Sequence, residues 1–181
     1  SRGRYTVPLV IRSPYGAGVR ALEHHSESTE ALFCQIPGLK VVAPSTPYDA
    51  KGLLKSAIRD DNLVQFHIHF PMMLSGLKGP VPEGEHLVPL GQAAVVREGK
   101  DVTIVGIAFT VKQALAAADQ LAKEGVSAEV IDPRSLAPLD IDTVLASVHK
   151  TGRLLVVDED FAPCGVAGEI AVQVMERGFD D

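Results

Sequence analysis

The chain has 181 residues, a formal net charge of −6 and no run of basic residues. This charge argues against nucleic acid as the main partner, and no apolar stretch approaches the roughly 20 residues that span a bilayer. The length allows one large domain or two small ones, each with a real core. Cys34 and Cys164 match no metal-ligand spacing, so we expect free thiols in a reducing, intracellular compartment.

The first 70 residues alternate between strand-like apolar runs and helix-like stripes. Val7–Ile11 is a continuous apolar run, typical of a strand that is covered on both faces. The clearest helix begins at Pro47, with Thr46 as its N-cap, and runs to Arg59. The other elements expected here are a short helix at Thr29–Ile36 and strands at Leu39–Ala43 and Leu63–Ile68. Strands that alternate with helices predict a parallel sheet.

Between Ser75 and Pro89 this alternation stops. The segment is rich in glycine and proline, which predicts an ordered linker between two domains. The second half then resumes as an open α/β domain. Its expected strands are Val102–Ile107, Ser127–Ile131 and Leu154–Val157, and its expected helices are Val111–Ala122, Ile141–Val148 and Gly165–Arg177. Because no element leads into the first strand and the chain stops just past a helix, we expect a fragment of a longer polypeptide.

A candidate chemical site is the pair His24-His25, which follows a glycine-rich turn and precedes the first helix. Proteins of the α/β class often place functional residues in the loop between a strand and a helix. Imidazole is also the side chain whose ordinary pKa lies near neutral pH. The alternative is that a histidine near a helix start only caps or packs.

Three other groups of polar residues have both a chemical and a structural interpretation. His67 and His69 would face one side of a strand and could form a metal pair, but no third ligand is near them in sequence, which favours a buried or interface role. Asp158-Glu159-Asp160 follows a strand and could bind a metal or a substrate, although a solvated loop or an interface is the commoner role of such a cluster. His149 suits the negative end of a helix.

The end of the helix Pro47–Arg59 offers a candidate cation site. Free carbonyl oxygens at a helix end, together with Asp60 and Asn62 just beyond it, form a hard ligand set of low charge. Most helix ends of this kind are capped only by water.

Long motifs in the chain resemble the beta subunit of thiamine-diphosphate-dependent 2-oxo acid dehydrogenases, with the acetoin and pyruvate types nearest. The motifs are Val7–Gly16, His24–Ser28, Pro37–Val42, Ser45–Asp60, Val130–Leu136, Lys150–Leu154 and Val156–Glu159. The resemblance implies an α/β fold. Residues 1–75 would be the second half of a pyrimidine-type domain, which binds thiamine diphosphate and contains a parallel sheet. Residues 76–91 would be a linker, and residues 92–181 would be a truncated transketolase C-terminal-like domain.

The resemblance also implies roles for single residues. His25 matches the family's active-site histidine, which lies beside the cofactor, stabilises the thiamine adduct and assists acyl transfer to the lipoyl group. A structural potassium ion would be held at positions that match Leu9, Ala57, Ile58, Asp60 and Asn62.

Some parts of the family's pattern are absent or altered. The glutamate that activates the cofactor's aminopyrimidine ring would lie upstream of Ser1, and the diphosphate and magnesium site belongs to the alpha subunit. Glu27 replaces a usual glutamine, and His67–Pro71 replaces a segment that usually carries a glutamate and a later tyrosine. We therefore expect this chain to be inactive alone.

The implied protein is an enzyme of a heterotetrameric alpha2beta2 complex, in a bacterial cytoplasm or an organellar matrix. It would decarboxylate or cleave a small 2-oxo compound on thiamine diphosphate and pass the acyl group to lipoyl-lysine on an acyltransferase core. The second half would serve subunit assembly and docking to that core, and neither nucleic acid nor a membrane is an expected partner. Two alternatives are a non-catalytic scaffold and a fragment of a transketolase or deoxyxylulose-phosphate synthase.

Overall fold

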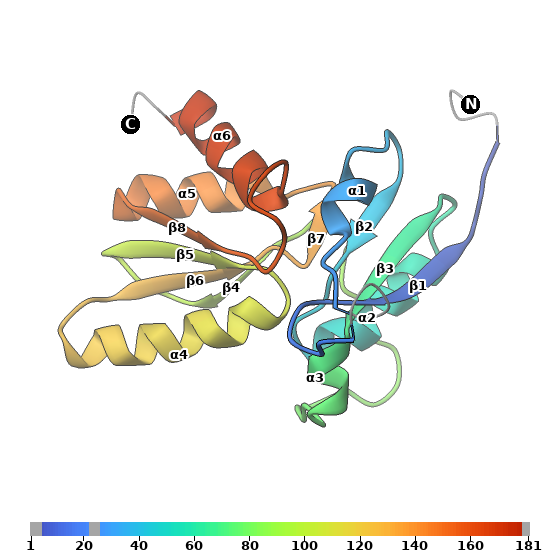
Figure 1. The fold of residues 1–181 in the computed structure, drawn as a ribbon, viewed down its shortest axis with the longest axis horizontal. Coiled ribbons are helices and arrows are strands. Elements are labelled where there is room, and N and C mark those ends of the chain that lie inside the picture. Colours follow the sequence, from blue (N-terminus) through green and yellow to red (C-terminus); the bar gives the residue numbers. More distant parts are fainter. Residues whose placement is uncertain (1–4, 22–25, 179–181) are drawn as a thin grey trace.

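The structure is a computed structural model that describes residues 5–21 and 26–178 (Figure 1). Two four-stranded sheets lie side by side, one formed mainly by the first half of the chain and the other by the second. The alternation of strands and helices expected from the sequence is present in both. No helix in these two described ranges is long and apolar enough to cross a membrane.

The first sheet has the strand order β1-β3-β2-β7. Strands β1, β3 and β2 run parallel, as the alternation predicts. Strand β7 was not expected from the sequence, and it comes from the second half to pair antiparallel with β2. The elements of this part are β1 (Val10–Tyr15), α1 (Glu30–Cys34), β2 (Lys40–Val42), α2 (Pro47–Ile58), β3 (Val64–His69), α3 (Phe70–Leu74) and β7 (Ser135–Ala137).

The first strand is the one whose predicted position was wrong. It runs from Val10 to Tyr15 rather than from Val7 to Ile11, because its register is set by β3, with Val10 opposite Val64. It lies at the edge of the sheet, and most of its side chains are exposed or half-buried, so it is not covered on both faces. The side chains of Val7, Leu9 and Ile11 remain 51%, 52% and 43% exposed.

Helix α2 begins as the sequence predicts. Thr46 accepts a hydrogen bond from the backbone N–H of Asp49 at 3.0 Å, and Pro47 takes the first turn. The helix buries Leu53 and Ala57 in a core with β3 and with Val88 of the segment that joins the two sheets. That segment has no helix or strand between residues 75 and 93, but it is bound to α2 where Ser56 donates to the Val88 carbonyl at 2.6 Å.

The second sheet has the order β4-β6-β5-β8, with β6, β5 and β8 parallel and β4 antiparallel at one edge. Strand β4 is another element that the sequence pattern did not indicate. Helix α4 covers one face of this sheet, and α5 and α6 lie on the other (Figure 1). The elements are β4 (Ala94–Arg97), β5 (Val102–Gly106), α4 (Phe109–Lys123), β6 (Ala128–Asp132), α5 (Ile141–Thr151), β8 (Leu154–Val157) and α6 (Val166–Gly178).

One apolar core joins the two sheets. Val41 of β2 and Tyr15 of β1 belong to the same buried cluster as Val105, Ile131 and Ile170 of the second half. Val42, the next residue of β2, points to the opposite face and packs with α2 instead. Because the cluster crosses the boundary between the halves, burial of apolar surface fixes the first sheet against the second.

Candidate functional site

The candidate catalytic residue His25 and its neighbour His24 lie outside the described residues, so the structure gives only the two flanks of their loop. The flanks are held together by two hydrogen bonds. The N–H of Gly16 donates to the carbonyl of Glu27 at 3.0 Å, and the N–H of Ala21 donates to the hydroxyl of Ser26 at 2.6 Å. The loop therefore begins at the carboxyl end of β1, which is where open parallel sheets commonly bind ligands.

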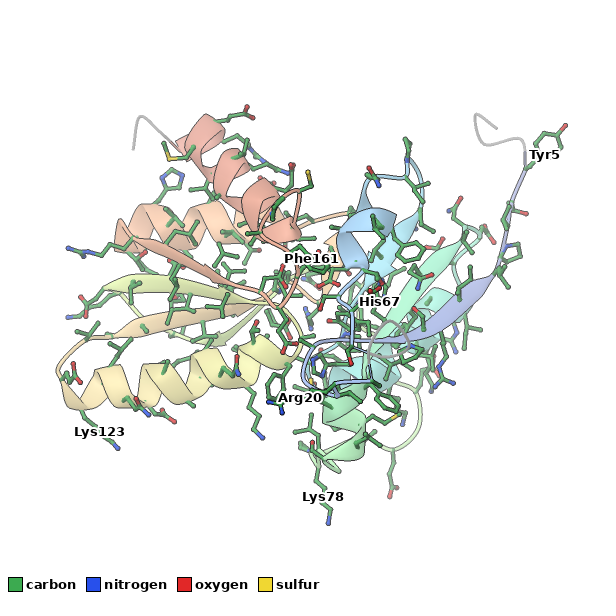
Figure 2. All side chains as sticks on the ribbon, in the orientation of Figure 1. Tyr5, Arg20, His67, Lys78, Lys123 and Phe161 are labelled. Carbon is green, nitrogen blue, oxygen red and sulfur yellow. The ribbon has the colours of Figure 1, made fainter. Side chains whose placement is uncertain are left out.

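His67 and His69 lie on the same side of β3, as expected, and both contact the ring of Tyr15, at centroid distances of 4.8 and 5.6 Å. Figure 2 shows His67 near the middle of the molecule. Burial lowers the pKa of His67 to about 4, so its ring is neutral, and its Nδ1 lies 3.4 Å from the hydroxyl of Ser13. The prediction of a buried role is confirmed, because both histidines are buried.

His69 has a partner that the sequence did not indicate. Its Nε2 lies 2.6 Å from a carboxylate oxygen of Glu159, on the loop after β8. Its ring is stacked on Phe109 at the start of α4, with 5.1 Å between the centroids. His69 and Glu159 stand out separately in the sequence, and only the fold brings them together. Within the described ranges, no three His, Cys, Asp or Glu residues are placed to hold a metal ion.

A group of carboxyl side chains, which we call the carboxyl cluster, lies where α1 meets the loop after β8. It consists of Glu30, Asp158, Glu159 and Asp160. Burial raises the pKa of Glu30 to about 8, and the negative charges of Asp158, Asp160 and Glu159 raise it further. Both carboxyl oxygens of Glu30 are buried without a hydrogen-bond partner in the described part of the chain. Glu30 is therefore mostly protonated at pH 7. The sequence did not indicate Glu30 as a candidate site residue, because a glutamate in the first turn of a helix is common.

The two cysteines are free thiols, as expected. Cys164 is exposed, and Cys34 is partly buried beside Glu30. Burial raises the pKa of Cys34 to about 12, with further contributions from Glu30, Asp160 and Asp158. A thiol with so high a pKa is a poor nucleophile at neutral pH.

A second connection between the halves is made by Arg134, just before β7. Its guanidinium donates to the carboxylate of Asp49 at 3.0 Å and to the carbonyl of Ala93 at 3.0 Å. Nearby, Ser45 donates a short hydrogen bond to the fully buried Asp132. Burial raises the pKa of Asp132 to about 7. Asp132 and Arg134 lie within the Val130–Leu136 motif, but their partners Ser45 and Asp49 could not be named from the sequence.

The residues of the candidate potassium site gather at one corner of the first sheet. Helix α2 ends at Ile58, the carbonyl of Ala57 accepts the N–H of Asp60 at 3.3 Å, and the carbonyl of Leu9 accepts the N–H of Val64 at 3.0 Å. Asp60 also accepts from the backbone and side chain of Asn62, at 2.9 and 3.0 Å.

The candidate cation ligands at this corner are oxygen atoms, of which one group is a carboxylate, a set that suits a monovalent or a hard divalent cation. Lys40 forms an ion pair with Asp60 and would compete with the cation for that carboxylate. The potassium assignment stays a prediction.

A cavity of about 450 Å³ lies between α2, β3 and α3. Its lining is mostly apolar, with Phe66 and Met72 among the contributors and Arg12 and Lys51 as its cations. The Lys51 ammonium already donates to the carbonyl of Pro82. The mostly apolar lining does not resemble a cradle of N–H donors for a diphosphate.

Comparisons with known proteins agree with this architecture. The chain matches the transketolase pyrimidine-binding domain over residues 1–69 and the transketolase C-terminal domain over residues 91–181. A solved structure described as a split-gene transketolase, an inactive beta4 tetramer, superposes with a TM-score of 0.78 at 26% identity. That match covers 95% of this chain and 55% of the other. The α/β fold class expected from the sequence is confirmed.

Curated relatives are considerably more similar. The beta subunit of acetoin:2,6-dichlorophenolindophenol oxidoreductase from Cupriavidus necator is 54% identical over 177 residues, which is 98% of this chain and 52% of that protein. The beta subunit of the pyruvate dehydrogenase E1 component from Bacillus subtilis is 50% identical over 179 residues, covering 99% of this chain and 55% of that protein. The 2-oxoisovalerate dehydrogenase beta subunit from the same organism is 44% identical over 181 residues.

This chain thus spans about half the length of the curated relatives it matches. The resemblance to dehydrogenase beta subunits is confirmed over nearly all of its residues. The chain belongs to the transketolase family, of which it carries the pyrimidine-binding and C-terminal domains, and its relatives include the beta subunits of pyruvate, acetoin and 2-oxoisovalerate dehydrogenases.

Proposed function

We propose that the chain is part of the beta subunit of a 2-oxo acid or acetoin dehydrogenase. Together with an alpha subunit it would cleave a small 2-oxo compound on thiamine diphosphate and pass the acyl group to lipoyl-lysine. The observation that carries this proposal is an identity of 54% to an acetoin-oxidising beta subunit and 50% to a pyruvate dehydrogenase beta subunit, each over nearly the whole chain.

The proposed contribution of this chain to the chemistry is His25. When bound, thiamine diphosphate supplies the carbanion chemistry of such a reaction. His25 would donate or accept a proton as the acyl group moves to the lipoyl sulfur, a task that suits a group with a pKa near neutral pH. Its loop starts at the carboxyl end of β1, and its two flanks are joined by the Gly16–Glu27 hydrogen bond.

The cofactor would be shared between subunits. The family resemblance implies that the alpha subunit holds the diphosphate, and the cavity beside α2 is mostly apolar. We therefore assign the diphosphate and its magnesium ion to the alpha subunit. A potassium ion at Asp60 and Asn62 would be structural, because it would tie the end of α2 to the start of β1.

The proposed assembly is an alpha2beta2 heterotetramer that docks on a lipoyl acyltransferase core, in a bacterial cytoplasm or an organellar matrix. A similar split-gene transketolase is described as an inactive beta4 tetramer, which agrees with a requirement for the other subunit. The competing scaffold hypothesis rests on the His67–Pro71 segment and on Glu27, which we expect to depart from the family's pattern.

Reconstitution tests this proposal. The full-length chain is produced with and without its alpha subunit, and thiamine-diphosphate-dependent reduction of 2,6-dichlorophenolindophenol is measured with acetoin, pyruvate or 2-oxoisovalerate. We expect dye reduction with one of these substrates only when both subunits and the cofactor are present. Dye reduction by the beta chain alone, or none by the assembled complex with any of the three, would contradict the proposal.

A further inference from the structure

We propose that His69 and Glu159 act as a positioning pair, which holds the glycine turn at the end of β1 and with it both flanks of the loop that contains His25. The pair itself is defined by contacts among described residues. Only its consequence for acyl transfer rests on the function proposed above.

The hydrogen bonds of the two His69 ring nitrogens fix the orientation of the ring. Its Nδ1 accepts the N–H of Met72 at 3.3 Å, so the proton of the neutral ring is on Nε2, which donates to Glu159 at 2.6 Å. The His69 side chain is 1% exposed and that of Glu159 is 21% exposed. Phe109 is stacked on the ring with an angle of 14° between the planes. Two of these three contacts come from the second half of the chain.

The ring in turn fixes the backbone of Gly16. A Cβ placed on Gly16 would overlap two atoms of the His69 ring, so the imidazole lies directly against this backbone. Gly16 also has a φ of +105°, in the left-handed region that glycine tolerates without strain. The Gly16 N–H closes the loop by donating to Glu27 at 3.0 Å. A continuous set of contacts therefore runs from Glu159 through His69 to the closure of the His25 loop.

His69 is suited to positioning rather than to proton transfer. Both of its ring nitrogens are engaged, one as an acceptor for Met72 and one as a donor to Glu159, so no nitrogen is left for a substrate. A carboxylate that orients a histidine through its ring N–H is a common way of fixing a ring in place. The unusual His67–Pro71 segment thus supplies the contact through which the second half supports the loop.

The test uses the full-length chain assembled with its alpha subunit and compares Glu159→Ala, Glu159→Gln and the surface control Asp119→Asn. The first readout is hydrogen exchange at the Gly16 amide, and the second is the kcat and KM for acylation of a lipoyl domain. We expect Glu159→Ala to speed Gly16 exchange about tenfold and to lower kcat about tenfold, with little change in KM. Glu159→Gln keeps an acceptor for the His69 N–H and should recover most of both effects.

Two outcomes for the alanine and glutamine variants overturn the proposal. Gly16 exchange within twofold of wild type in Glu159→Ala overturns the proposal, and so does a glutamine variant that behaves like the alanine variant. If Glu159→Ala does not assemble, Glu159→Asp, which moves the acceptor back by one methylene, must show an intermediate rise in Gly16 exchange. A wild-type complex that cannot acylate lipoyl domains would refute the proposed function, while Gly16 exchange would still test the positioning pair.

Discussion

Replacing Arg134 by alanine is expected to lower the free energy of unfolding by about 3–5 kcal/mol, because it leaves the buried Asp49 carboxylate without its cation. The two side chains are 11% and 8% exposed and form a 3.0 Å ion pair. The guanidinium also donates to the carbonyls of Gln92 at 3.1 Å and Ala93 at 3.0 Å. Alanine would remove all of these donors at once, at the boundary between the two halves.

Urea unfolding at pH 7 measures this loss. The backbone of Arg134 is left-handed, with a φ of +58°, but alanine also has a Cβ, so the difference reports the side chain and not the backbone. Arg134→Lys keeps the positive charge but loses the planar set of N–H donors of the guanidinium. It should therefore recover only part of the stability that Arg134→Ala loses.

Arg97→Ala is the matched control for Arg134→Ala. It breaks an ion pair to Asp119, whose side chain is 72% exposed, and should cost less than about 1 kcal/mol. Equal losses in the free energy of unfolding for Arg97→Ala and Arg134→Ala would show that the buried Arg134–Asp49 pair does not stabilise the fold more than an exposed pair does.

Replacing Glu30 by glutamine is expected to stabilise the protein by an amount that grows with pH. Glu30 is 1% exposed, and burial raises its pKa from 4.5 to about 8. Between these two pH values the folded chain keeps a proton that the unfolded chain releases, so the free energy of unfolding falls as the pH rises. At pH 7 the cost reaches about 3 kcal/mol, from 2.5 pH units at about 1.36 kcal/mol each. Glutamine has nearly the same shape and no proton to lose, so it removes this cost.

The measurement is the free energy of unfolding of Glu30→Gln and wild type at several pH values between 4.5 and 8. Asp132 contributes a slope of its own, since its pKa is raised to about 7, but it is present in both proteins and cancels in their difference. Glu124→Gln makes the same chemical change at an exposed position and should show no pH-dependent gain. A difference between Glu30→Gln and wild type that stays constant from pH 4.5 to 8 would disagree with a buried, protonated Glu30.

Local signals in the sequence were sufficient for the described helices except α3 (Phe70–Leu74), which the sequence pattern did not indicate. Helix α2 begins at Pro47 with Thr46 as its cap, because the capping residues and the apolar stripe lie within a few residues of one another. Strand β7 could not be found in this way, since its three residues are too few to show a period and its partner β2 lies in the other half of the chain. The start of β1 was misplaced for a related reason, because pairing with β3, and not the apolar run, decides where it begins.

In the candidate site too, single residues could be identified from the sequence, whereas contacts between distant residues could not. His69 and Glu159 each stood out as a titratable side chain at the end of a strand, but they are 90 residues apart and their contact depends on how the two sheets pack. Glu30 gave no signal at all, because its altered pKa is a consequence of burial by another part of the chain. Family resemblance supplied the role that we expect for His25, because residue chemistry alone could not distinguish His25 from His24.

The most direct test of the account is acyl transfer by the reconstituted complex with His25→Ala, and with His24→Ala as the neighbouring control. The rate of lipoyl-domain acylation is measured at saturating substrate and cofactor. If His25 moves a proton during transfer, acylation should fall about a hundredfold or more in His25→Ala and only slightly in His24→Ala. Unchanged acylation in His25→Ala would contradict the account and would favour a beta chain that keeps the fold without this chemistry.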